Sequence, residues 1–174
     1  MNQEFAVVPA RPYVYAVPGF ALLAALIGLG FVAYQGEPKI AWLLPCLLLA
    51  AFIIVWIVRR NRVSLEDGSL RILAGLNRRT ITIGELDLSG ARIVDLAEHT
   101  SLKPFLKVMA TSLPGYNAGH FRLRDRSKAF VLVTDYSKVL LLPEKSGRKL
   151  LLSLERPQAL LDALQRLADR RIGG

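Results

Sequence analysis

The sequence predicts a membrane hairpin of two helices followed by a mainly-β domain of about seven strands, capped by a C-terminal amphipathic helix. Three observations support this fold class. Of the 174 residues, the first 58 have two basic and two acidic side chains, so the whole net charge of +9 lies beyond them. Two long charge-free runs occupy that first part. Behind them, short segments alternate between apolar and polar residues, as the strands of a half-buried sheet do.

This contrast divides the chain into three parts. They are an N-terminal tail at 1–12, a transmembrane hairpin at 13–58 with spans at 13–34 and 40–58, and a domain at 59–174. At about 1.5 Å per residue, each span is close to the roughly 30 Å of a hydrocarbon core. The alternative, a pair of core helices in a soluble protein, is disfavoured because neither run has the polar stripe of an amphipathic helix. The single cysteine, Cys46, excludes a disulfide framework and is expected to be an inert apolar residue.

The charges beside the spans predict their orientation. A cleaved signal peptide is disfavoured, because Arg11 is the only basic residue before an apolar run that is longer than such peptides have. The connection between the spans has one positive charge, Lys39, whereas Arg59, Arg60 and Arg62 follow the second span. By the positive-inside rule the domain faces the cytoplasm, and two crossings return the N-terminus to the same side.

Small residues recur along the first predicted span. Ala21 and Ala25, and Ala24 and Gly28, are four residues apart. This spacing allows another helix to approach closely, either the second span or another copy of the chain. Alanine and glycine are also common in membrane helices, and that alternative remains open.

The domain begins with a predicted β-hairpin. Segments 62–66 and 69–73 alternate on either side of Asp67-Gly68, a dipeptide typical of hairpin turns. Further strands are predicted at 79–83, 91–96, 119–124, 128–133, 138–142 and 149–153. The links 125–127 and 134–137 are short enough for hairpins, so we expect seven or eight antiparallel strands. Residues 98–117 contain two prolines and a glycine, and a long loop is predicted there.

The last segment changes from strand to helix periodicity. In 156–171, Leu160, Leu161, Leu164 and Leu167 recur three or four residues apart, as on one face of an amphipathic helix. Pro157 suits the first helical turn. Such a helix covers apolar side chains that a small bent sheet cannot bury alone.

This order of elements resembles the bacterial pleckstrin-homology-like (PH-like) domains. The segments that carry the resemblance are Gly115-Tyr116, Gly119-His120-Phe121, Val131–Thr134, Val139–Leu142, Leu150–Ser153 and Pro157–Leu164. Asp125-Arg126 departs from the family, where glycine is more usual in the turn. The resemblance extends to the layout, since many such proteins have a transmembrane hairpin before the domain. It implies a non-enzymatic binding or assembly module and supplies no catalytic residues. With the two predicted spans, the expected location is the bacterial cytoplasmic (inner) membrane.

No pattern for catalysis or cofactor binding is present. The sequence has no nucleotide-binding loop, no zinc-spaced cysteines and no Ser-His-Asp order, so no cofactor is expected. A metal site would need His99 and His120 to converge with a carboxylate, Asp95 or Glu98. The favoured alternative is that they are loop residues facing water. Because His120 alternates with Phe121, the imidazole is expected to face solvent if Phe121 faces the core.

The basic residues offer two candidate surfaces. Arg59, Arg60 and Arg62 are held near the bilayer, where an anionic leaflet attracts each by about 1 kcal/mol. Arg122, Arg124 and Arg126 share one face of a strand and its turn. Nucleic acid is not expected, because basic and acidic residues are interspersed and no exposed aromatic platform accompanies them.

Together these patterns predict a membrane-anchored module that binds a membrane or cytoplasmic protein, with homo-oligomerisation also possible. The alternative is a regulator in which Arg122, Arg124 and Arg126 bind anionic lipid headgroups. For those three arginines the favoured explanation is a solvated sheet face.

Overall fold

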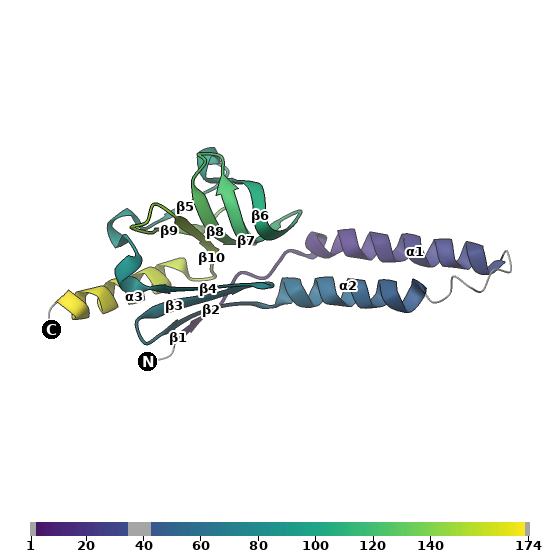
Figure 1. Cartoon of the computed structure of the whole chain (residues 1–174), viewed down its shortest axis with the longest axis horizontal. Helices are drawn as coiled ribbons and strands as arrows, with labels where there is room; N and C mark the ends of the chain where they lie inside the picture. The colour runs from purple at the N-terminus through teal and green to yellow at the C-terminus, as the bar shows by residue number, and fades with distance from the viewer. Residues whose placement is uncertain (1–2, 35–42, 173–174) are drawn as a thin grey trace.

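The computed structural model of the chain describes residues 3–34 and 43–172, which form a pair of helices and a strand-rich domain (Figure 1). Helices α1 (Ala16–Tyr34) and α2 (Leu43–Arg59) lie side by side and extend away from the strands. A short 3-10 helix, η1 (Pro12–Tyr15), leads into α1. The domain contains two sheets and the C-terminal helix α3 (Pro157–Ile172).

The predicted membrane hairpin is supported only in part. Within the described residues, one helix, Pro12–Val32, has the length and the mean hydropathy (2.0) needed to cross a membrane. The apolar part of α2, Pro45–Arg59, is shorter. The predicted connection 35–39 and the first residues of the predicted span 40–58 lie outside the described residues.

The first sheet is antiparallel and has the strand order β1-β2-β3-β4. Its strands are β1 (Gln3–Phe5), β2 (Asn61–Glu66), β3 (Ser69–Ala74) and β4 (Asn77–Thr82). The predicted β2–β3 hairpin is confirmed. Asp67 and Gly68 have φ angles of 46° and 75°, as a two-residue type I′ turn requires. No sequence pattern predicts β1, yet Phe5 of the expected tail pairs with Val63.

The second sheet has six strands in the order β5-β9-β10-β8-β7-β6. They are β5 (Arg92–Val94), β6 (Pro104–Leu113), β7 (Tyr116–Leu123), β8 (Lys128–Val133), β9 (Val139–Pro143) and β10 (Lys149–Ser153). The β7–β8 hairpin is confirmed, and Arg126 adopts a positive φ of 67° in its turn.

The expectation of a β8–β9 hairpin and a fully antiparallel sheet is wrong. Strand β10 lies between β8 and β9 and runs parallel to β8. The link 134–137 crosses the end of β10 instead of closing a hairpin. There the Ser153 hydroxyl donates to the carbonyl of Asp135 at 2.7 Å and lies 3.3 Å from the backbone nitrogens of Thr134 and Asp135.

The prediction of a long loop at 98–117 is wrong from Pro104 onward, where β6 forms the ten-residue edge strand of the second sheet. Before it, Thr100–Leu102 is a single 3-10 helical turn. Pro104 is the first residue of the strand, a position that tolerates a missing N–H. Register shifts at Pro104/Leu106 and Lys107/Met109 interrupt its pairing with β7. Such bulges break the two-residue alternation by which a strand is recognised in sequence.

The domain has two apolar cores, one on each face of the second sheet. Leu142 and Leu152 face the first sheet and α3, where Leu160 and Leu164 of the confirmed helix are fully buried. Leu141 and Leu151 face the opposite side, where Leu96 and Leu102 cover them. Since both faces of β9 and β10 are buried, these strands are continuous apolar runs in the sequence.

Candidate functional site

The base of α2 is joined to both sheets through Asn61. Its side-chain amide donates to the carbonyl of Val58 at 2.7 Å, at the end of the helix. Its side-chain oxygen accepts from the backbone N–H of Gly75 and from the hydroxyl of Tyr116, both at 3.1 Å. Burial raises the pKa of Tyr116 to about 12. This network fixes the orientation of the domain at the end of α2.

The segment before α1 is fixed to the second sheet. The backbone N–H of Val8 donates to the backbone carbonyl of Ser153 at 3.1 Å, and the carbonyl of Val8 accepts from the Thr134 hydroxyl at 2.7 Å. Arg11 forms an ion pair with Asp135 at 2.9 Å. A hydrogen bond from the backbone N–H of Ser137, together with that from Arg11, lowers the pKa of Asp135 to about 2. The start of α1 and the end of α2 are therefore both held by the strands of one domain.

The first predicted basic cluster lies at this base. Arg59, Arg60 and Arg62 are exposed. The guanidinium carbon of Arg60 lies 4.7 Å from the centre of the Trp56 ring, a cation–π contact. Arg62 lies 3.7 Å from the Glu4 carboxylate in β1. The cluster surrounds the point where α2 meets the domain.

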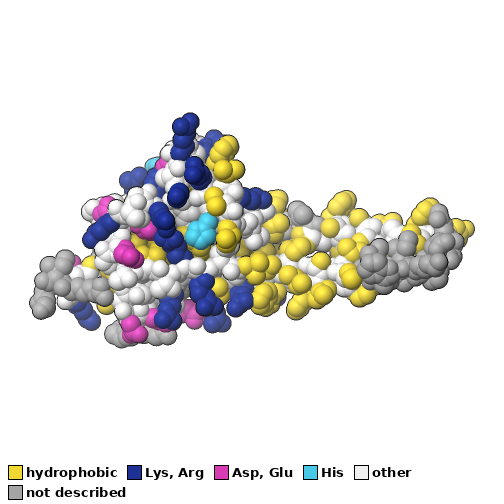
Figure 2. All heavy atoms as spheres, viewed as in Figure 1, with side chains coloured by type: hydrophobic (Ala, Val, Ile, Leu, Met, Phe, Trp, Pro, Cys, Tyr) yellow, Lys and Arg dark blue, Asp and Glu magenta, His cyan; other side chains and the backbone are white. Residues whose placement is uncertain are grey.

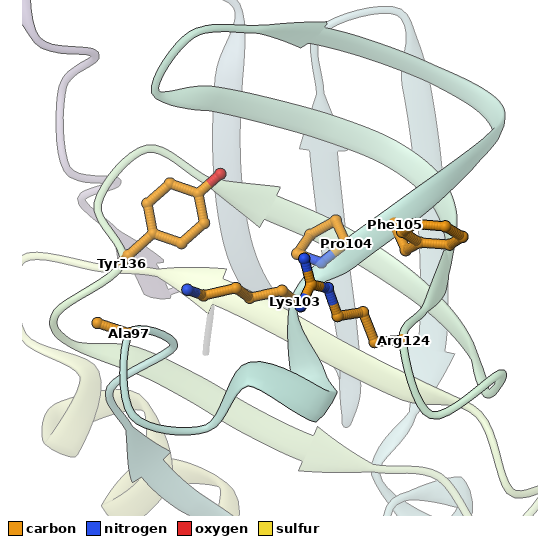
Figure 3. Close-up of a pocket in the computed structure, with 6 residues that line it drawn as sticks. All are labelled: Ala97, Lys103, Pro104, Phe105, Arg124 and Tyr136. Atoms are coloured by element: carbon orange, nitrogen blue, oxygen red, sulfur yellow. The ribbon is translucent and has the colours of Figure 1, made fainter.

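Arg122, Arg124 and Arg126 are exposed at the end of β7 and in its turn. Arg122 is opposite Lys128 of β8. Arg124 lines a cavity of about 470 Å³ with Ala97, Lys103, Pro104, Phe105 and Tyr136. Figure 3 shows the Arg124 guanidinium next to Pro104, whereas the Lys103 side chain extends toward Ala97 and the Tyr136 ring.

A second group of basic residues converges between the two sheets, and sequence analysis did not identify it. We call this the inter-sheet groove. It has a volume of about 710 Å³ and is lined mainly by Arg78, Arg79 and Thr80 of β4, His120 of β7, and Glu144, Lys145, Ser146 and Arg148 before β10. The β4 residues and those before β10 are more than sixty residues apart in the chain. Only the docking of one sheet on the other brings them together.

One ion pair forms the floor of the inter-sheet groove. Nη2 of Arg79 donates to both carboxylate oxygens of Glu144, at 2.8 and 3.0 Å, and both side chains are largely buried. Nε of Arg79 is buried and has no partner among the described residues. Arg78, Lys145 and Arg148 form no ion pair with another described residue. Glu85 also lines the groove, so its four basic residues, Arg78, Arg79, Lys145 and Arg148, face two carboxylates and leave an excess of positive charge.

The two histidines do not meet. His99 is exposed, and its Nδ1 lies 3.2 Å from the backbone oxygen of Asp95. His120 is half-buried, because the face of β7 opposite Phe121 looks into the inter-sheet groove; its ring contacts Phe130 edge-on at 5.0 Å. Burial lowers the pKa of His120, and Arg79 and Arg148 lower it further. Within residues 3–34 and 43–172, no three histidine, cysteine, aspartate or glutamate side chains lie close enough together to hold a metal ion.

The small residues of α1 are divided between two faces. Ala25 is half-buried, as are Leu22 and Leu29 at helical spacing from it. Ala21, Ala24 and Gly28 are exposed, and a Cβ added to Gly28 would meet no atom within 4 Å.

Comparison with protein families supports the resemblance noted in the sequence. A family profile described as the bacterial PH domain matches residues 61–168. The match begins at β2 and ends in α3, so it includes both sheets except β1. No curated protein and no solved structure is significantly similar to the chain. The chain belongs to the bacterial PH domain family.

Proposed function

We propose that this protein is a non-enzymatic binding module that α1 and α2 anchor in the bacterial cytoplasmic membrane. The observation that carries this proposal is the apolar surface of the two helices. Phe20, Phe31 and Phe52 are each more than 60% exposed. In water this surface would be strongly unfavourable, at about 25 cal/mol for each Å² of apolar area. Hydrocarbon chains of a bilayer remove that cost.

The charges at the base give the orientation of the anchored domain. Arg59, Arg60 and Arg62 lie where α2 meets the strands, whereas the predicted connection contains one basic residue, Lys39. Cationic residues are retained on the cytoplasmic side. Since β1 precedes α1 and pairs with β2, the N-terminus and the domain lie on the same side. This pairing favours two crossings, with both termini in the cytoplasm.

Fractionation and cysteine labelling test the anchor. The full chain is expected to sediment with membranes and to resist extraction by alkaline carbonate. In a Cys46→Ser background, a membrane-impermeant maleimide should label Glu37→Cys in intact spheroplasts and Ser137→Cys only after permeabilisation. Release by carbonate, or labelling of Ser137→Cys in intact spheroplasts, would contradict the proposal.

The inter-sheet groove is the surface that we assign to the protein partner. Arg78, Lys145 and Arg148 present positive charge there, so an acidic segment of a partner fits it. The pKa of His120 is lowered partly by Arg79 and Arg148. An anion bound in the groove would offset these positive charges and raise that pKa.

A glutamate-rich peptide is a suitable probe for the inter-sheet groove. With the full chain in nanodiscs of zwitterionic lipid, we expect peptide binding by fluorescence anisotropy and a higher pKa of the His120 imidazole by NMR. The double variant Arg78→Ser/Arg148→Ser should lose about tenfold or more in affinity. Arg124→Ser/Arg170→Ser removes the same charge elsewhere and is the control. Equal losses in both variants would show that net charge, rather than the groove, attracts the peptide.

A further inference from the structure

Strand β6 exposes a run of large apolar side chains. Phe105, Leu106, Val108 and Met109 are between 54% and 72% exposed. β6 is the last strand of the second sheet, so one of its edges pairs with no other strand of the described residues. Large apolar patches on a protein surface mark binding sites.

The charge around these side chains is mainly positive. From Lys103 to Arg124, across β6 and β7, the sequence contains four basic residues and no aspartate or glutamate. Arg124 lies near Pro104 and Phe105, whereas the Lys103 side chain extends from the same cavity toward Ala97 and Tyr136 (Figure 3). Lys107 is exposed within the apolar run. The nearby Asp125, which follows Arg124, is paired with Lys149. An apolar strip with an excess of cations beside it is complementary to an anionic lipid surface, which offers negative headgroups above hydrocarbon.

The position of β6 places this strip toward the membrane. The β6–β7 turn packs on the residues that lead into α1, since a Cβ on Gly115 would overlap the Tyr13 ring. On the face shown in Figure 2, most hydrophobic atoms of the upper lobe lie on its side nearest the helices. The β3–β4 turn beside α2 also exposes an apolar side chain, Leu76.

A second copy of the chain fits this edge less well. Pairing of two β6 strands would bring two sets of lysines and arginines together with no acidic residue between them, and like charges at a contact are costly. The bulges at Pro104/Leu106 and Lys107/Met109, and the lysine within the edge, are features that oppose strand-to-strand association. The leaflet requires no such pairing.

We propose that β6 lies in the headgroup region of the anionic cytoplasmic leaflet, with Phe105, Leu106, Val108 and Met109 inserted and Lys107 and Arg124 at the phosphates. This contact rests on the proposed membrane anchoring. The β6 edge is then the lipid-contacting part of the domain, and this contact holds the domain in one orientation on its two helices. The inter-sheet groove is lined by other residues and remains available to a partner.

Lipid-quenching experiments on the full chain test this contact. In a Cys46→Ser background, an environment-sensitive dye is attached to Val108→Cys, and the protein is reconstituted in vesicles of phosphatidylcholine and phosphatidylglycerol. Lipids with a spin label near the headgroup should quench the dye at position 108. A dye on Ser146→Cys, in the exposed turn before β10, should not be quenched. A dye on Phe52→Cys reports on the anchor and should be quenched by lipids labelled deep in the acyl chain.

Charge reversal tests the basic residues. Lys107→Glu/Arg124→Glu should remove most of the quenching at position 108, whereas Lys138→Glu/Arg170→Glu, with the same change in charge, should leave it unchanged. Unquenched dye at position 108 with quenched dye at position 52 overturns the leaflet contact and leaves the anchor standing. Unquenched dye at position 52 contradicts the anchor itself. If two chains of the undyed Val108→Cys variant form a disulfide with each other, and the dyed variant is not quenched, a second copy covers β6 instead.

Discussion

The two sheets of this domain differ in how many of their faces are covered. The first sheet buries one face: on β3, Leu70, Ile72 and Ala74 are buried, whereas Arg71 is exposed. The second sheet buries both faces of its central strands, so Leu150, Leu151 and Leu152 are all fully buried. A one-sided sheet tolerates polar residues at every second position, and a two-sided sheet does not. Stability should therefore respond differently to substitutions along the two sheets.

The largest expected effects come from adjacent residues of β10. Leu151→Ala and Leu152→Ala should each lower the free energy of unfolding by about 2–5 kcal/mol, because both leave a cavity in a packed core. On β3, Ile72→Ala should cost a similar amount, whereas Arg71→Ala should cost less than about 1 kcal/mol. Denaturant unfolding in detergent micelles measures the free energy of unfolding of all four variants. A small effect of Leu151→Ala would show that the second core contributes little.

The same difference explains which strands the sequence could predict. The strands of the β2–β3 hairpin alternate, and their turn has a suitable dipeptide, so local pattern suffices. For β8, β9 and β10 the pattern indicates strands but not their order, because each is an apolar run that any neighbour could pair with. Strand β6 lacks both signals: its bulges break the alternation and its apolar side chains are exposed.

Gly119 of β7 lies in close contact with β6 of its own sheet and with β4 of the other sheet. It has a φ of 119°, and a Cβ there would lie 2.5 Å from the carbonyl oxygen of Met109 and 2.6 Å from the amide nitrogen of Asn77 in β4. Gly119→Ala should therefore destabilise the domain by about 1–3 kcal/mol or more. Gly147→Ala, also at positive φ but in open space, is the control for backbone strain alone. Equal losses would mean that the close contacts around Gly119 add no cost to the backbone strain.

The candidate sites were predictable only where they are local. Arg59, Arg60 and Arg62 follow an apolar run, and Arg122 and Arg124 are two residues apart, so the sequence alone indicated both clusters. The inter-sheet groove joins β4 to the turn before β10. No pattern within either segment indicates that they meet, because their proximity depends on how the two sheets pack.

Substitutions where the helices join the sheets should lower the free energy of unfolding less than substitutions in the cores. Asn61→Ala leaves the Tyr116 hydroxyl and the carbonyl of Val58 without their partner, which should cost about 1–3 kcal/mol. Asn61→Asp keeps the acceptor for Tyr116 and Gly75 and should recover part of this loss. Thermal unfolding in detergent compares the two variants. An unchanged stability of Asn61→Ala would show that the network does not hold the helices to the domain.

The smallest effect is expected where the N-terminal segment meets the second sheet, and it depends on pH. The pKa of Asp135 is lowered to about 2 from an ordinary value of 3.8, so its ionised form is favoured in the folded state. The stabilisation is complete above the ordinary value and is lost as the pH falls through about 2. Because the side chain is partly solvated, we expect no more than about 1 kcal/mol. Asp135→Asn should thus lower Tm near neutral pH, and this difference from the unmodified protein should shrink below pH 4. Asp169→Asn, on the exposed side of α3, should show no such pH-dependent difference, and a constant deficit of Asp135→Asn across this range would exclude the ion pair with Arg11 as its cause.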